Sequence, residues 1–222
     1  AHAESRPAVL VTFDPIPPVY FAKLPPNSNI TLADERADLA EQLGMDAVVT
    51  LPFGAEVARM AGASFLRGLS GATRMKELWM GSDFRLGNDR LGRDTGLTDV
   101  LTGMGCEPIV TERIQSGEEE LSSSRIRTLL SEGDLDHANE LLSYPFFIRN
   151  VIQHGAQIGT RIGIPTLNIS FPECKIRLPF GVYVTRTLLD GMQFESITSI
   201  GVRPTFYEKS EVVIESYLFD VA

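Results

Sequence analysis

Short apolar runs alternate with helical stretches along the first part of the chain. The runs are continuous and end at turns, which is typical of buried parallel strands, and they cover residues 8–15, 46–53, 76–84 and 107–114. Helical stretches separate them at residues 31–44, 55–69 and 95–105. Thr31 suits an N-cap, and Gly44 and Gly105 suit left-handed C-terminal caps. The pattern predicts an α/β fold whose parallel sheet is covered by helices on both faces.

The pattern changes after Tyr144-Pro145. Before this point, residues 122–143 predict two short helices divided by Gly133, with Asp134 as the second N-cap. Beyond it the sequence predicts only strands, at residues 146–155, 165–171, 181–189, 192–201 and 212–220, with an Asp190-Gly191 hairpin turn. We therefore expect a domain at 1–143 followed by a small antiparallel β-barrel or sandwich at 144–222.

Composition and charge restrict the classes of partner. The net charge is −9 and the pI is about 4.9, so the surface repels nucleic acid and anionic membranes, and we expect neither as a partner. Cys106 and Cys174 show no metal-ligand spacing, which predicts reduced thiols. No apolar run approaches the length of about 18 residues that a membrane helix needs, and the first residues lack the organisation of a signal peptide. These features predict a cytoplasmic protein.

A glycine-rich loop follows the third predicted strand, in the segment "GSDFRLGNDRLG" at 81–92. Ligands of open α/β sheets bind beyond the carboxyl ends of the strands, and glycines let the backbone approach them closely. Asp83, Arg85 and Arg90 supply charge in this loop. The alternative is an ordinary solvated loop, and the spacing alone leaves both interpretations open.

A second candidate is "SSSRIR" at 122–127, which opens a predicted helix. Positive residues in a first turn oppose the helix macrodipole, so Arg125 and Arg127 weaken the helix unless an anion binds there. Free N–H groups, serine hydroxyls and a guanidinium could together hold a phosphate. An ordinary serine N-cap with solvent-facing arginines is the alternative.

A third candidate combines a glycine-rich segment with polar strand residues. Gly155, Gly159 and Gly163 could form a flap whose N–H groups face phosphates. Thr166 and Asn168 lie two apart on a predicted strand, so their side chains share a face. Neutral oxygen ligands suit Mg²⁺ when nucleotide phosphates supply the negative charge. A loop followed by a strand with solvent-facing polar residues would give the same pattern.

The last predicted strand, "VVIESYLFD", carries a carboxylate among apolar residues. Because side chains alternate along a strand, Glu215 points to the opposite face from Ile214 and Leu218. A general base acting on a substrate hydroxyl would justify this carboxylate, because a charge buried without a partner is costly. An edge-strand charge that deters aggregation would also explain it.

The motifs together resemble the bacterial bifunctional riboflavin kinase/FAD synthetase family along nearly the whole chain. The family pattern contains "TFDPHP", "G-x-DFxFGxxRxG", "SSTRIR", "GDVxxAxxLLGRPY", "GxPTAN", "NIGxRPT" and "ExHLLDF". In the same order this chain has "TFDPIP", "GSDFRLGNDRLG", "SSSRIR", "GDLDHANELLSYPF", "GIPTLN", "SIGVRPTF" and "ESYLFD".

The resemblance implies a Rossmann-like first domain at 1–143, a small antiparallel β-barrel at 144–222, and two activities with riboflavin, FMN and ATP as small-molecule substrates. The second domain would transfer the γ-phosphate of ATP to the 5′-hydroxyl of riboflavin, and the first would transfer AMP from ATP to FMN. Glu215 would be the kinase base, and Thr166 and Asn168 would hold Mg²⁺. The ATP and phosphate residues of the kinase would be Gly155, Gly159, Arg161, Gly163, Pro165, Thr166 and Asn168. The nucleotide and FMN residues of the adenylyltransferase would be Asp14, Asp83, Phe84, Arg90, Ser123, Ser124 and Arg125.

The chain departs from the family pattern at several positions. The family's "GxFDGxHxGH" segment is absent, Ile16 replaces a histidine, Thr160 stands where the flap usually has a basic residue, and Leu167 replaces an alanine. The sequence also stops before the family's last strand and C-terminal helix. We therefore expect that these residues as written do not make FAD.

Two other hypotheses stay open at this point. One is a flavin- or nucleotide-binding module without catalysis, which Ile16 and Thr160 favour. The other is a different nucleotidylyltransferase joined to an unrelated barrel, which the "PTLN" and "SIGVRPTF" segments argue against.

Overall fold

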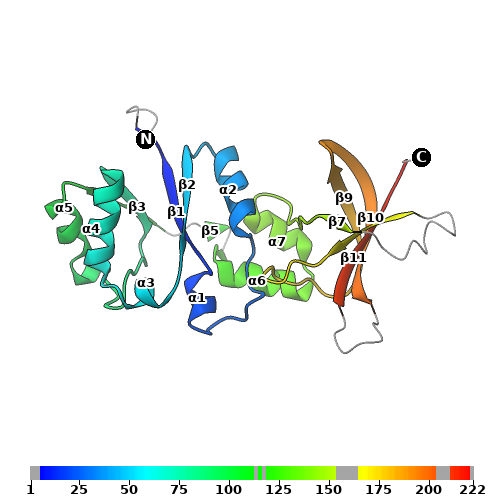
Figure 1. Ribbon diagram of the computed structural model, residues 1–222, viewed down its shortest axis with the longest axis horizontal. Coiled ribbons are helices and arrows are strands. Elements are labelled where there is room, and N and C mark those ends of the chain that lie inside the picture. The colour runs from blue at the N-terminus through cyan, green and yellow to red at the C-terminus, as the bar shows by residue number, and fades with distance from the viewer. Residues whose placement is uncertain (1–5, 113–114, 117–118, 154–164, 204–210, 221–222) are drawn as a thin grey trace. The chain divides into compact units, whose positions relative to one another are not determined.

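The computed structural model describes residues 6–112, 115–116, 119–153, 165–203 and 211–220 (Figure 1). The chain divides into two compact units. The first contains Ala1–Pro25 and Ala33–Ser122, and the second contains Pro26–Leu32 and Ser123–Ala222. The expected domain boundary between residues 143 and 144 stays a prediction.

Parallel strand pairs form the first unit, as the apolar runs predict. Strand β1 (Val9–Asp14) pairs in parallel with β2 (Ala47–Pro52), and β3 (Glu77–Gly81) pairs in parallel with β4 (Glu107–Thr111). The register places Asp14 beside Pro52 and Gly81 beside Thr111 at the carboxyl ends. A short antiparallel pair, β5 (Gln115–Ser116) and β6 (Glu119–Glu120), follows. The predicted α/β class with parallel strands is confirmed.

The helices of the first unit mostly lie where the sequence predicts them. They are α1 (Pro17–Tyr20), α2 (Ala33–Gln42), α3 (Ala55–Arg59), α4 (Gly62–Thr73), the 3₁₀ turn η2 (Arg93–Thr95) and α5 (Leu97–Gly103). The single helix predicted over residues 55–69 is wrong, because Met60 and Ala61 are extended, with ψ of 135° and 144°. The break has partners outside the helices, since Asn88 donates its backbone N–H to the Met60 carbonyl (3.0 Å) and its Nδ2 to the Arg59 carbonyl (2.7 Å).

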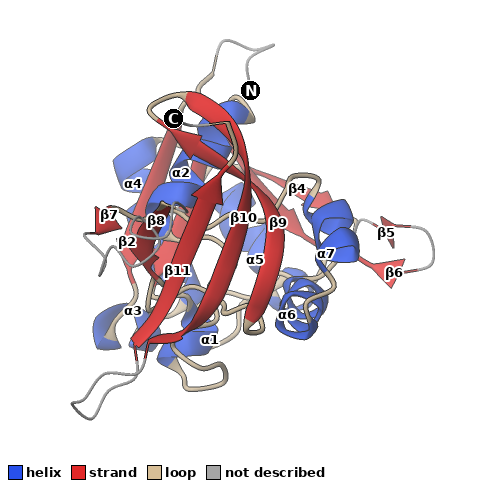
Figure 2. Cartoon of the chain, turned by 90° about the vertical axis from the view of Figure 1, so that its right-hand side faces the viewer, coloured by secondary structure: helices blue, strands red, loops and turns tan. Residues whose placement is uncertain are grey.

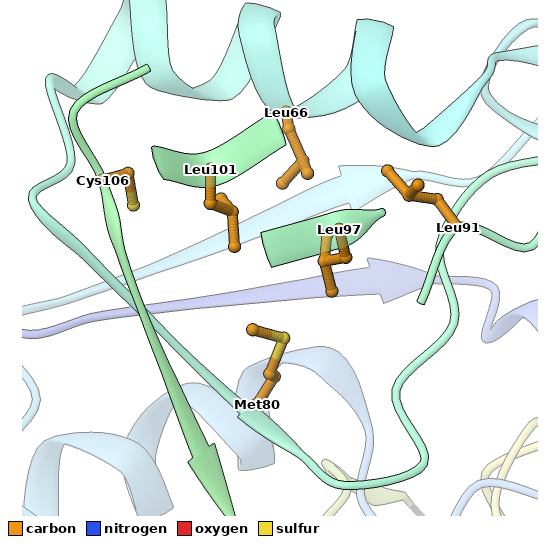
Figure 3. Close-up of a cluster of buried hydrophobic side chains, with 6 residues drawn as sticks. All are labelled: Leu66, Met80, Leu91, Leu97, Leu101 and Cys106. Carbon is orange, nitrogen blue, oxygen red and sulfur yellow. The ribbon is translucent and has the colours of Figure 1, made fainter. Parts of the chain in front are cut away.

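The core of the first unit lies between α4, α5 and β3. Figure 3 shows the side chains that meet there, which are Leu66, Met80, Leu91, Leu97, Leu101 and Cys106. Burial in this cluster raises the pKa of the Cys106 thiol. Leu91 belongs to the glycine-rich loop 81–92, so the core fixes one end of the loop that follows β3.

Two helices open the long segment of the second unit, as predicted. Helix α6 (Ser123–Glu132) buries Ile126, Leu129 and Leu130, and α7 (Leu135–Leu142) follows it. Gly133 adopts a φ of +84° between them, a left-handed value that glycine accepts without strain. Asp134 is the N-cap of α7, because its Oδ1 accepts the His137 backbone N–H at 3.3 Å.

An antiparallel sheet completes the second unit (Figure 2). Its strand order is β7 (Ile152–Gln153), β8 (Thr166–Ser170), β11 (Glu211–Leu218), β10 (Met192–Arg203) and β9 (Gly181–Leu189). All neighbours in this five-stranded sheet are antiparallel. Asp190 and Gly191 have φ of 50° and 78°, as a hairpin turn of the predicted kind requires. The predicted antiparallel strands are confirmed.

A row of hydroxyl groups runs across the buried face of this sheet. Thr198 Oγ1 lies 2.7 Å from both Thr185 Oγ1 and Ser216 Oγ, and Ser196 Oγ lies 2.7 Å from Thr185 Oγ1 and 2.9 Å from Thr187 Oγ1. Ser196, Thr198 and Ser216 are buried. Hydroxyl groups can both donate and accept, so each one in the row meets the hydrogen-bonding requirement of its neighbour.

A segment from early in the chain packs into the second unit. The Asn29 backbone N–H donates to the Cys174 carbonyl at 3.1 Å, and the Ile176 N–H donates to the Asn29 carbonyl at 2.8 Å. Between these bonds, Lys175 is buried, with its ammonium 4.9 Å and 4.8 Å from the ring centres of Phe146 and Phe147. The strand and helix pattern of the sequence does not signal this contact.

The helices in the part of the chain that the structure describes are short. None of the helices within the described residues combines the length and the apolar character that a membrane span requires.

Candidate active sites

Glu215 lies on the face of β11 that is opposite the buried one. Its neighbours Ile214 and Ser216, and Leu218 beyond them, are 3%, 9% and 8% exposed, whereas Glu215 is half-buried. This alternation confirms the two faces that the period of two predicts. The carboxylate therefore lies next to solvent in the middle of the sheet.

Strand register surrounds Glu215 with polar residues. Asn168 on β8 pairs directly with Glu215, and Ser199 on β10 pairs with it from the other side. Gln153 on β7 pairs in turn with Asn168. Because paired residues point to the same face and adjacent strands lie about 4.8 Å apart, these four form one polar row across the sheet. The sequence pointed to Glu215 and Asn168 only.

Thr166 lies on the same face as Asn168, two residues earlier on β8. It pairs with Tyr217, and its carbonyl accepts a hydrogen bond of 3.3 Å from Asn168 Nδ2. This bond fixes how the Asn168 amide is turned. The structure thus brings together the three residues on which the kinase prediction depends, Thr166, Asn168 and Glu215.

The donor set on this face suits a hard cation only in part. A threonine hydroxyl, an asparagine amide and one carboxylate offer oxygen atoms, the ligand type that Mg²⁺ prefers. Within the described ranges no group of three or more His, Cys, Asp or Glu residues could hold a metal. Such a set fits a metal ion whose remaining ligands are phosphate oxygens and water.

The predicted flap is only partly visible. Pro165 is exposed and leads directly into β8. The other predicted residues of this segment, Gly155, Gly159, Arg161 and Gly163, lie outside the described residues.

The predicted residues of the first unit lie at or just beyond the carboxyl ends of its strands. Asp14 ends β1 and is exposed, and its carbonyl accepts the Phe53 N–H at 3.0 Å. Asp83 is exposed just after β3. Phe84 is half-buried and packs against the core cluster, so at least part of its ring has a structural role.

The two arginines of loop 81–92 have different environments. Arg85 donates to the Phe84 carbonyl at 2.9 Å and lies 3.1 Å from Asp94. Arg90 is exposed, and its guanidinium has no hydrogen-bond or ion-pair partner within the described part of the chain. Of the two, Arg90 is the one available to an anionic ligand.

An aromatic cluster beside Asp14 is a feature that the sequence reasoning missed. Phe53 contacts Phe13, Tyr20 and Phe21, with ring centres 5.3, 5.3 and 5.7 Å apart. Tyr20 is 39% and Phe21 51% exposed, which is high for such large rings. The cluster lies where β1 and β2 end, a position at which open α/β sheets bind ligands. The signal in the sequence was the aromatic residues of "PPVYF" and "LPF", directly after two predicted strand ends.

Ser123, Ser124 and Arg125 form the first turn of α6 and belong to the second unit. Ser123 and Ser124 are exposed, as an anion site requires. Arg127 has a structural role, because its Nε donates to the Ser28 carbonyl at 2.8 Å. Burial there lowers the pKa of the Arg127 guanidinium.

Comparisons with known proteins match both parts of the chain to families. The FAD synthetase family matches residues 1–125, and the riboflavin kinase family matches residues 142–222. The "Bifunctional riboflavin kinase/FMN adenylyltransferase" of Bacillus subtilis is 32% identical over 215 residues, which are 95% of this chain and 67% of that protein. Proteins of the same description from Pseudomonas fluorescens and Escherichia coli K12 are each 29% identical, over 97% of this chain and 69% of their own.

A solved structure has a similar fold. It is a Streptococcus pneumoniae crystal structure titled as a macrolide-efflux protein, with a TM-score of 0.86 and 24% identity. The match covers 100% of this chain and 72% of that one. At this identity the likeness concerns the fold alone.

Proposed function

The chain belongs to the bifunctional riboflavin kinase/FMN adenylyltransferase family, and from this premise we propose which residues carry each of the two reactions. Residues 142–222, which match the riboflavin kinase family, phosphorylate riboflavin to FMN, and residues 1–125, which match the FAD synthetase family, transfer AMP from ATP to FMN, which gives FAD and pyrophosphate. Both reactions gain chiefly from positioning and from neutralising phosphate charge. Such chemistry suits a site with oxygen ligands and an arginine and without a covalent nucleophile.

Glu215 is the general base of the kinase in this proposal. Its carboxylate accepts the proton of the riboflavin 5′-hydroxyl, the oxygen attacks the γ-phosphorus of ATP, and ADP leaves with the bonding electron pair. The single observation that carries the proposal is the register that pairs Glu215 with Asn168. A base must lie within hydrogen-bond reach of the proton it takes, next to the phosphates that receive the oxygen.

Thr166 and Asn168 hold the phosphate end of the nucleotide. Their side-chain oxygens would bind Mg²⁺, which when bound neutralises the phosphate charge. The Asn168 bond to the Thr166 backbone carbonyl holds the Asn168 amide in one orientation before substrate arrives. Gly155, Gly159, Arg161, Gly163 and Pro165 are the residues we assign to the flap over the phosphates.

In the first unit, the exposed strand ends bind FMN and ATP. Tyr20 and Phe21 offer an exposed aromatic surface against which a flavin ring can stack. Arg90 offers a guanidinium to the phosphates, where a planar fork binds oxygen pairs well. The FMN phosphate attacks the α-phosphorus of ATP, and pyrophosphate leaves. We assign Asp14, Asp83, Phe84, Ser123, Ser124 and Arg125 to the same reaction by motif.

We also propose that the enzyme works in the cytoplasm. Cys106 and Cys174 are both free thiols, as a reducing compartment requires.

The test of the kinase assignment is Glu215→Gln in the intact protein. Glutamine keeps the shape of the side chain and cannot accept the proton, so kcat for FMN formation should fall by about 10²–10⁴-fold. The matched control is Glu195→Gln, since Glu195 is an exposed carboxylate of β10 that faces Arg186. Near-normal turnover by Glu215→Gln would exclude the base assignment. Flavin binding without any ATP-dependent product in the unsubstituted protein would favour a binding module instead.

A further inference from the structure

We propose that Asp89 is a positioning residue for adenylyl transfer, because it fixes the backbone that carries Arg90. The inference rests on the proposed role of loop 81–92 in binding phosphates. Asp89 itself would not touch the substrate. Its carboxylate holds the tip of the loop to the start of α4, at the break between α3 and α4.

The start of α4 is capped by Asp89 from a distant part of the sequence. The N-cap residue Ala61 makes no side-chain capping bond. Instead, Asp89 Oδ1 accepts the Gly62 backbone N–H at 2.9 Å. A carboxylate at this end is also favoured by the helix macrodipole, and the first N–H groups of a helix otherwise lack partners.

The loop and the helix start touch so closely that neither can carry a side chain at the contact. A Cβ on Gly87 would lie 2.1 Å from the Gly62 nitrogen, and Gly87 also has a φ of +75°. A Cβ on Gly62 would lie 2.7 Å from Leu91 Cβ and 2.8 Å from the Leu86 carbonyl. Asn88 adds its two bonds to Met60 and Arg59. We call this contact between residues 87–89 and 59–62 the loop clamp.

Arg90 is held between two anchored neighbours. Asp89 is bound to α4 on one side, and on the other side Leu91 is 7% exposed and pairs with Leu86 through backbone bonds of 2.8 and 2.9 Å. Arg90 itself has a φ of +53°, a left-handed conformation that costs a non-glycine residue free energy. The anchors on both sides offset that cost and keep the guanidinium on a fixed backbone.

The experiment compares Asp89→Ala with Asp89→Asn in the intact protein, well below the melting temperature. Alanine removes the acceptor, so kcat/KM for FAD formation from FMN and ATP should fall by about tenfold or more, since small misplacements of a binding group are costly. Asparagine keeps an oxygen at the same position and should retain most of the rate. Riboflavin phosphorylation by the same chain should change less than about twofold.

Two further variants separate positioning from a general loss of stability. Gly87→Ala introduces a side chain at the loop clamp, where a Cβ would collide with Gly62, so it should lower kcat/KM for FAD formation as Asp89→Ala does. Asp46→Ala is the matched control, because Asp46 Oδ2 also accepts a backbone N–H, that of Ala8 at 2.6 Å, at the amino end of β1. It should leave FAD formation within about twofold. Hydrogen exchange of the Leu86, Asn88 and Leu91 amides should rise in Asp89→Ala and stay low in Asp46→Ala.

The results distinguish this inference from the function on which it rests. If Arg90→Ala lowers FAD formation and Asp89→Ala does not, Asp89 has no positioning role and the inference is overturned alone. If Arg90→Ala changes nothing, or the intact protein makes no FAD, the assignment of the loop fails and the inference fails with it. Losses in Asp89→Ala and Gly87→Ala that Asp89→Asn does not share support the inference.

Discussion

Arg85 and Arg90 lie in the same glycine-rich loop, and residue type alone does not show which of them is available to a substrate. Their surroundings in the structure distinguish them. The Arg85 side chain covers Gly92, where an added Cβ would lie 2.4 Å from its guanidinium nitrogen, and it also faces Asp94. Arg85 therefore helps to shape the loop, while the exposed Arg90 is available to a substrate.

Alanine at each arginine should therefore have a different effect. Arg90→Ala should lower kcat/KM for FAD formation about 10- to 100-fold, since a hydrogen bond to a charged group contributes about 1.5–3 kcal/mol. It should leave the melting temperature nearly unchanged. Arg85→Ala should lower the melting temperature and affect the rate less. Steady-state kinetics and thermal melts of both variants check this, and equal rate losses would contradict it.

Residue identity and strand period made Glu215 and Asn168 candidates, and the family resemblance implied their roles, but neither pointed to their neighbours. A period of two tells which side chains share a face of one strand. It does not tell which strands are adjacent, and here β8 pairs with β11 although β9 and β10 lie between them in sequence. Gln153 and Ser199 join the polar row only through this order. Such register depends on the whole sheet, so local pattern could not reveal it.

At the scale of elements, the helix break after Arg59 shows a similar limit. The stretch 55–69 has helical periodicity throughout, and local propensity favours one helix. In the structure, Asn88 and Asp89 bind the backbone groups that the break leaves without helical partners. Tertiary contacts with a distant loop thus override local propensity. The two separate helices on either side of Gly133 were predicted correctly, because the glycine and the N-cap that divide them are local features of the sequence.

Helix α7 depends on its N-cap in a way that pH can reveal. Hydrogen bonds from the His137 ring and backbone, together with the positive charge of Arg125, hold the pKa of Asp134 below its ordinary value of 3.8. A lowered pKa in the folded state means that the carboxylate stabilises the fold above about pH 4, and that this contribution is lost as the pH falls through the folded pKa.

Asp134→Ala should therefore lower the melting temperature at pH 7 and should have a smaller effect at pH 3. Thermal melts of both proteins at the two pH values measure the difference. The control is Asp136→Ala, because Asp136 is an exposed acid of the same first turn. A loss of stability for Asp134→Ala that is as large at pH 3 as at pH 7 would rule out the charged cap.

The buried hydroxyl row should make the antiparallel sheet sensitive to a change of almost no volume. Thr198→Val replaces a hydroxyl by a methyl and leaves Thr185 and Ser216 each short of one partner. A buried polar group without its partner costs about 1–3 kcal/mol, so the free energy of unfolding should fall by about that amount. Urea denaturation measures it, with the exposed strand residue Thr50→Val as control. A change below about 0.5 kcal/mol in Thr198→Val would contradict the role of the row.

At the scale of the whole molecule, the sequence correctly predicted an α/β part followed by a part with antiparallel strands. It did not predict that residues 26–32 belong to the second unit. Helix and strand signals are local, whereas Asn29 joins the second unit through backbone bonds to Cys174 and Ile176. Those bonds form between residues far apart in sequence, and they involve no periodic pattern. The second unit therefore includes a segment that comes before most of the first.

The separation of the two reactions onto different residues gives the last prediction. Glu215 lies in the second unit, and loop 81–92 with the aromatic cluster lies in the first, so the two reactions use different residues. The intact Glu215→Gln protein should then make almost no FAD from riboflavin and ATP, and should still make FAD from supplied FMN at a rate within about twofold of the unsubstituted protein. Chromatography of the flavins after incubation with each substrate separates these cases. Equal loss with both substrates would mean that Glu215 serves adenylyl transfer as well, and that the two reactions do not use separate residues.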